Sequence, residues 1–120
     1  MGQEGFRSLI VWQRSRDLAI KLYRLFPHQH RRSADGLIEQ IHRSAVSVPS
    51  NIAEGDERQT DREAVRYFYI AKGSLAELRT QLDIAYHSDL LTDDQWAYLD
   101  KECEEIGKML GGPIKARKRY

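Results

Sequence analysis

The sequence predicts an all-α fold: one antiparallel bundle of four helices that run up, down, up and down, as a single domain over residues 1–120. Four segments carry apolar residues at alternating steps of three and four, the spacing that places side chains on one face of a helix. No segment shows the period-two alternation of a half-buried strand. The connections between the four segments are short, and short connections favour antiparallel neighbours packed at roughly 20°.

The first helix is predicted over about residues 9–26. Pro27 ends it, because the residue before a proline is biased out of the helical region. A polar and basic connector follows. The apolar face of this helix repeats through Trp12, Ser15, Ala19, Leu22 and Phe26.

The second helix is predicted over about residues 36–54, and it contains a proline. Pro49 lacks the N–H that would bond the Ala45 carbonyl, and its ring clashes with that carbonyl, at a cost of ~3 kcal/mol. We therefore expect a kink here, and we expect Gly55 to stop the helix. The short polar side chains positioned to bond the loosened backbone are Ser47, Ser50 and Asn51.

The third helix, predicted over about residues 61–87, is the longest. Thr60 and Glu63 precede it in a capping-box pattern, in which the two side chains accept backbone N–H groups that the helix leaves unpaired.

A second capping box, Thr92 and Gln95, opens the fourth helix, predicted over about residues 93–110. The run of two glycines and a proline at residues 111–113 is typical of a helix end. The residues that remain, 113–120, form a short basic tail.

Composition describes an ordinary globular protein, with 41% hydrophobic and 31% charged residues and a net charge of +1. Binding to nucleic acid would therefore depend on uneven placement of charge. The single cysteine, Cys103, excludes an internal disulfide framework, and its place on the apolar stripe of the fourth helix predicts a buried side chain. The N-terminus has no apolar signal core, and no apolar run is long enough to cross a bilayer. We expect a cytoplasmic protein that does not contact a membrane.

Few residues have the spacing of a catalytic or metal site. Glu39 and His42 form the Glu-x-x-His pair that di-iron bundles use, but such sites need a second pair. Asp83 with His87 is the nearest substitute and has a different form. We therefore expect no enzyme activity, metal or cofactor, and a metal-dependent enzyme built on Glu39 and His42 is the weakest alternative. Two further histidines, in a predicted polar loop, are His28 and His30.

Basic residues are predicted to gather at one end of the bundle. The turn after the second helix and the C-terminus share that end in an up-down bundle, so Arg58, Arg62 and the tail should lie together beside Tyr120. Such a cluster would bind phosphate and stack a base; the alternative is a solvated tail. The residues predicted to contact nucleic acid, two of them in the connector after the first helix, are Arg31, Arg32, Arg58, Arg62, Lys115, Arg117, Lys118 and Arg119.

Apolar bands wider than a core requires indicate either a broad buried face or an oligomer interface. The residues that widen these bands are Tyr67, Ile70 and Ile84 on the third helix, and Val11, Leu18 and Leu25 on the first.

Two stretches of the sequence are distinctive: Pro-x-Asn-Ile-Ala-Glu-Gly at residues 49–55 and Gly-Ser-x-x-Glu-Leu at residues 73–78. Through these stretches the chain resembles the four-helix-bundle proteins often encoded within intervening sequences of bacterial 23S ribosomal RNA genes. The resemblance covers nearly the whole length. It also includes Phe6, Leu9, Val11-Trp12-Gln13, Pro27, Gln40, Arg58 and Thr80-Gln81-Leu82.

The resemblance implies a left-handed up-down bundle that assembles into a ring, commonly a homopentamer. It also implies kinship with the accessory protein of diversity-generating retroelements, a basic pentamer that contacts nucleic acid and the reverse transcriptase. This chain departs from those relatives in its net charge of only +1 and in its acidic fourth helix.

Within this family, polar residues of the second and third helices would form a layer that fixes helix register or subunit contacts. Small residues let two helices approach closely, and Arg43 or Arg58 would neutralise Glu54 or Glu77, which would be costly to bury unpaired. The layer comprises Arg43, Ser47, Pro49, Asn51, Glu54, Gly55, Gly73, Ser74 and Glu77.

The sequence thus predicts a non-enzymatic, ring-forming bundle whose partners are further copies of itself and RNA or a nucleic-acid-processing protein. The alternative is a structural protein–protein adaptor that does not bind nucleic acid.

Overall fold

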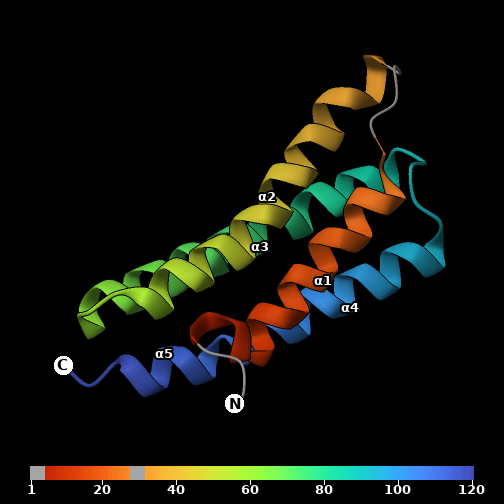
Figure 1. Ribbon diagram of the computed structural model, residues 1–120. Helices are drawn as coiled ribbons and strands as arrows, with labels where there is room; N and C mark the ends of the chain where they lie inside the picture. Colours follow the sequence, from red (N-terminus) through yellow and green to blue (C-terminus); the bar gives the residue numbers. More distant parts are fainter. Residues whose placement is uncertain (1–4, 28–31) are drawn as a thin grey trace.

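The computed structural model describes residues 5–27 and 32–120, with side chains from residue 36 onward in the second range (Figure 1). Most of the described residues are helical, and none of them lies in a strand. The elements in chain order are the 3-10 helix η1 (Gly5–Ser8) and the α-helices α1 (Ile10–Leu25), α2 (Arg32–Glu57), α3 (Asp61–His87), α4 (Asp93–Met109) and α5 (Gly111–Arg117).

The four long helices form the predicted up-down-up-down bundle. Each of α1 to α4 packs against the next, and α1 also packs against α4, which closes the bundle. The last residues of α1, the first residues of α2 and the α3–α4 connection lie at one end, and the α2–α3 turn, α5 and the C-terminus lie at the other (Figure 1). The end at which basic residues were expected to meet is therefore a real feature of the fold.

All four helices contribute apolar side chains to one core, as their spacing predicts. Burying a side chain of this size contributes about 1.5–3 kcal/mol. Cys103 is fully buried among them, and burial raises the pKa of its thiol to about 12. The largest fully buried residues are Leu22, Ile41, Val48, Ile52, Phe68, Leu78, Leu82, Ile106 and Leu110.

The acidic residues of α4 pair largely within the bundle. Arg14 of α1 bonds Glu102 at 3.0 Å and Glu105 at 2.9 Å. Arg79 of α3 bonds Asp100 at 3.0 Å. Much of the negative charge of this helix thus joins α4 to its two neighbours.

Helix α2 contains Pro49 in its interior, as expected, and its axis bends partway along its length (Figure 1). The helix does not stop at Gly55, so that prediction was wrong; it continues to Glu57. Gly55 has a packing role: an added Cβ would lie 2.7 Å from Phe68 Cε1 and 2.9 Å from the Ala64 carbonyl oxygen. Glycine here allows α2 and α3 to approach closely.

The N-terminal cap of α4 follows the sequence pattern in full, and that of α3 follows it in half, because the Thr60 hydroxyl bonds as predicted but no bond from the Thr60 N–H to the Glu63 carboxylate is formed. Thr60 Oγ1 accepts the Glu63 N–H at 3.2 Å. The box at α4 is complete, because Thr92 Oγ1 accepts from Gln95 N–H and Gln95 Oε1 accepts from Thr92 N–H.

The prediction of a basic tail missed the helix α5. Helix α4 ends before the two glycines, but Leu110 keeps a helical conformation, and the chain turns directly into α5. Pro113 lies in the first turn of α5, where its missing N–H has no helical acceptor. Ile114 is buried, and α5 packs against α3.

Candidate nucleic-acid interface and assembly surfaces

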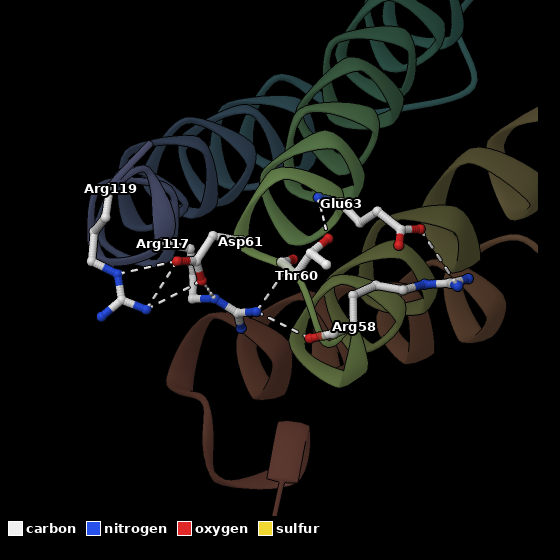
Figure 2. Close-up of polar contacts among 6 residues, drawn as sticks. All are labelled: Arg58, Thr60, Asp61, Glu63, Arg117 and Arg119. Atoms are coloured by element: carbon white, nitrogen blue, oxygen red, sulfur yellow. Dashed lines mark hydrogen bonds and ion pairs between the residues drawn. The ribbon is translucent and has the colours of Figure 1, made fainter.

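The basic end of the bundle brings Arg58 together with Arg117, as Figure 2 shows, and Arg62 together with Tyr120, as the topology predicts. Arg31 lies outside the described residues. Arg32 begins α2, whose first residue lies at the opposite end, so it is not part of this group.

Asp61 is the centre of the basic end. It is the first residue of α3, where a carboxylate interacts favourably with the helix dipole. Arg117 Nε donates to it at 2.6 Å, and Arg119 reaches it at 3.1 Å (Figure 2). These hydrogen bonds, that of Arg117 first, hold the pKa of Asp61 below its ordinary value.

Arg117 also fixes the end of α2. Its guanidinium donates to the Arg58 carbonyl at 3.0 Å and to the Thr60 carbonyl at 3.5 Å, just beyond the helix. Carbonyls that follow a helix have no helical donor, and an arginine is a common partner for them. Arg117 therefore joins α5 to the α2–α3 turn.

Arg58 is also engaged within the chain. It bonds Glu54 at 3.0 Å and the Tyr67 hydroxyl at 2.9 Å, and Glu63 lies at 3.9 Å. Its guanidinium lies over the Tyr67 ring, 4.6 Å from the centroid. The pair of Arg58 and Glu54 is one of the arginine–carboxylate pairs expected from the sequence, and its spacing of four residues is that of a helical ion pair.

Three exposed cations at this end form no ion pair with a described residue: Arg62, Lys115 and Lys118. Arg62 lies 4.3 Å from the centroid of the Tyr120 ring. Lys118 lies 5.6 Å from that of Tyr69.

The α2–α3 polar layer is present, with different partners from those expected. The hydroxyls of Ser47 and Ser74 bond at 2.8 Å, and Asn51 Nδ2 donates to the Ser47 carbonyl at 2.8 Å. Ser44 Oγ donates to Glu77 at 3.3 Å. Glu77 is exposed, so the expectation that its charge is buried and needs an arginine was wrong.

Other members of the predicted layer face solvent. Glu54 is exposed beside Arg58, and no described carboxylate pairs with the exposed Arg43. Gly73 is exposed as well, and an added Cβ would meet no atom within 4 Å. Close helix approach within one chain therefore explains Gly55 and does not explain Gly73.

An open groove lies between α1 and α2, and sequence periodicity did not reveal it. It has a volume of 440 Å³. A second hollow of 320 Å³, which shares Tyr23 and Val46 with it, continues toward His42 and Arg43. We call the first hollow the α1–α2 groove; its lining is Arg16, Ala19, Ile20, Tyr23, Arg24, Val46 and Pro49.

The wide apolar bands divide into two groups. Val11 and Leu18 are buried, so they belong to the core. Ile70 and Ile84 of α3 are 39% and 48% exposed and remain uncovered. The sequence missed Ile20, Tyr23 and Val46, since each lies off the main apolar stripe of its helix.

The described part of the chain contains no cluster of side chains that would support the alternative of a metal-dependent enzyme. No three His, Cys, Asp or Glu side chains there are grouped closely enough to hold an ion. His42 is buried and stacks on Tyr23 with ring centroids 4.0 Å apart, and Asp83 accepts the Trp96 indole N–H at 2.9 Å. His28 and His30 lie outside the described residues.

These features define a four-helix bundle with a basic end and uncovered apolar surfaces, and one family model matches the chain. That model, the 23S rRNA-intervening sequence protein, matches residues 7–112, so the chain belongs to this family. Helix α5 lies mostly beyond the matched range.

A protein of unknown function from the S23 ribosomal protein family of Bacteroides thetaiotaomicron has a similar structure. Its TM-score is 0.79 at 23% identity, over 88% of this chain and 99% of that one. No curated protein is significantly similar to the sequence. Within the described residues, no helix is both long and apolar enough to span a membrane.

Proposed function

We propose that this protein is a non-enzymatic, self-associating bundle whose biochemical role is to form an assembly of several copies. The observation that carries the proposal is the set of large apolar side chains left uncovered on α1, α2 and α3. Ile20, Tyr23 and Val46 are each 42–45% exposed around one groove. Exposed apolar patches with polar surroundings mark interaction surfaces in soluble proteins.

Several features agree with self-association. The two uncovered surfaces lie on different helices, one on α1 and α2 and the other on α3. Two separate patches on each copy allow a repeating contact, which yields a ring where the rotation closes. A ring, commonly a pentamer, is also what the family resemblance leads us to expect.

Light scattering of the purified full-length chain after size exclusion tests this proposal. We expect a mass that is a multiple of 14.0 kDa and that persists on dilution. A particle of 14.0 kDa at every concentration would contradict self-association.

Binding of single-stranded nucleic acid is a second candidate function. It is favoured by one observation: Arg62 lies over the exposed ring of Tyr120 and Lys118 lies near that of Tyr69, with the exposed Lys115 on α5 as a third cation at the same end. Cations next to aromatic faces are the usual elements of sequence-independent binding to single strands. In an assembly the three charges would be repeated in each copy, which strengthens weak contacts by avidity.

Fluorescence anisotropy with a single-stranded RNA at two salt concentrations tests this second function. Each phosphate contact contributes about 0.7 to the slope of log K against log salt for single strands, so replacing all three cations with alanine should lower that slope by about 2 per copy. Substitution is better than truncation, because removing α5 also removes the bonds that Arg117 makes to the α2–α3 turn.

A matched control replaces Lys101 with alanine, since this cation is exposed but lies in the middle of α4, away from the basic end. An RNA affinity that the triple substitution leaves unchanged would exclude this interface. Absence of RNA binding at low salt would leave a protein–protein adaptor as the role of the assembly.

A further inference from the structure

We propose that the α1–α2 groove of one copy takes the outer face of α3 from a second copy. We call that face the α3 ridge and define it as Ile70, Gly73, Glu77 and Ile84. This inference rests on the proposed self-association and names the two surfaces that meet.

The groove has the shape and chemistry of a site for apolar side chains. Its 440 Å³ are bounded by the exposed side chains of Ile20, Tyr23 and Val46 and by Pro49. The Pro49 of this lining is the proline in the interior of α2. No described element of the same chain covers it.

The ridge has the spacing of a single helical stripe. Ile70, Gly73, Glu77 and Ile84 follow one another at steps of three, four and seven, which place them on one side of α3. Ile70 and Ile84 are exposed, and they would supply apolar groups of the size the groove can hold.

The exposed glycine at position 73 also supports a contact between the ridge and a second copy. Glycine inside an exposed helix is disfavoured relative to alanine, and nothing within the chain requires it, because a Cβ there would meet no atom within 4 Å. A neighbouring copy pressed against the ridge would supply the close contact that a single chain lacks.

The charges of the two surfaces are complementary. Arg24 lines the groove and Arg43 lines the adjoining hollow, and neither forms an ion pair with a described residue. Glu77 lies at the middle of the ridge, exposed, with the Ser44 hydroxyl as its bonding partner. Opposite charges that face each other across an interface fix its register and disfavour wrong partners.

The contact is heterologous, because the groove and the ridge are different surfaces. Each copy that fills a neighbour's groove keeps its own groove open, so the contact repeats around a ring or along a chain.

A mixing experiment tests both the surfaces and the heterologous geometry. Val46→Glu places a charge in the groove and leaves the ridge intact, and Ile84→Glu does the converse. Both positions are exposed, so each variant should fold, which far-UV circular dichroism checks. Ile10→Glu is the matched control, since Ile10 is 62% exposed and belongs to neither surface.

We expect each of the two variants alone to be monomeric at 14.0 kDa and the control to keep the mass of the wild type. Mixed in equal amounts, the two variants should form a dimer of twice 14.0 kDa, because one intact groove meets one intact ridge and neither end can extend. Variants that keep the wild-type mass, or a mixture that stays monomeric, would overturn the assignment. A monomeric wild type would instead overturn the proposed function itself.

A charge exchange provides an independent readout. Glu77→Arg should weaken the assembly, and adding Arg24→Glu and Arg43→Glu in the same chain should restore it. Failure of this rescue, with all variants folded, would show that these charges do not face each other.

Discussion

Replacement of Gly55 by alanine is the most direct test of how α2 and α3 pack. An added Cβ would lie 2.7 Å from Phe68 Cε1 and 2.9 Å from the Ala64 carbonyl oxygen. The carbonyl belongs to the backbone of α3, and Phe68 is fully buried, so neither atom can move without displacing a helix or the core.

The expected loss of stability follows from two opposing effects. Overpacking of this kind costs about 2–3 kcal/mol, and the higher helix propensity of alanine returns about 1 kcal/mol. The net effect is a destabilisation of about 1–2 kcal/mol. With an unfolding entropy of about 2.1 cal/mol/K per residue, the Tm should fall by about 4–8 °C.

Thermal unfolding followed by circular dichroism measures this change, with Gly36→Ala as the control in the same helix. Gly36 is exposed, and a Cβ there would meet no atom within 4 Å, so its replacement should raise the stability slightly. If Gly55→Ala were as stable as the wild type, the close approach of α2 and α3 at this residue would be refuted.

Two further predictions concern ionisable groups. Arg117 and Arg119 lower the pKa of Asp61, so this carboxylate stabilises the fold above its unfolded pKa, and the stabilisation is lost as the pH falls through the folded value. The difference in unfolding free energy between the wild type and Asp61→Asn should therefore be present at neutral pH and shrink as the pH falls below the unfolded pKa of about 3.9; a difference that stays constant in urea titrations across this range would contradict this. Cys103, buried and with its pKa raised to about 12, should react with a thiol reagent at mildly alkaline pH only after unfolding, and rapid labelling of the native protein would show that the core around it opens.

The fold could be predicted from the sequence because the main signals are local. The steps of three and four along each segment follow from helix geometry, and the caps at Thr60 and Thr92 depend on residues three positions apart. Helix α3 accordingly begins and ends where the pattern indicates, at Asp61 and His87.

The predictions about helix ends that were wrong have a common physical cause, which is contact with residues distant in sequence. Glycine is the residue type that most often ends a helix, but at Gly55 the side chain of Phe68 packs closely against the backbone and the helix continues. Residues after Gly112 look like a tail, but Ile114 finds a buried place against α3. In both cases tertiary packing outweighs the local signal.

The candidate sites show the same limit. The predicted topology brings Arg58, Arg62 and the C-terminal cations to one end of the bundle. The sequence could not show that two of these cations, Arg117 and Arg119, are already paired with Asp61. Ile20 and Tyr23 could not be recognised as surface residues until the neighbouring helices were in place.

Disulfide formation between two differently labelled chains tests the central claim most directly. One chain carries Val46→Cys in the groove and the other carries Ile84→Cys on the ridge; the native Cys103 is buried and should not take part. Mild oxidation of the mixture should yield a linked dimer on a non-reducing gel, while each variant alone stays unlinked. A mixture without the linked dimer, or equal linkage in the separate variants, would contradict a contact between the α1–α2 groove and the α3 ridge.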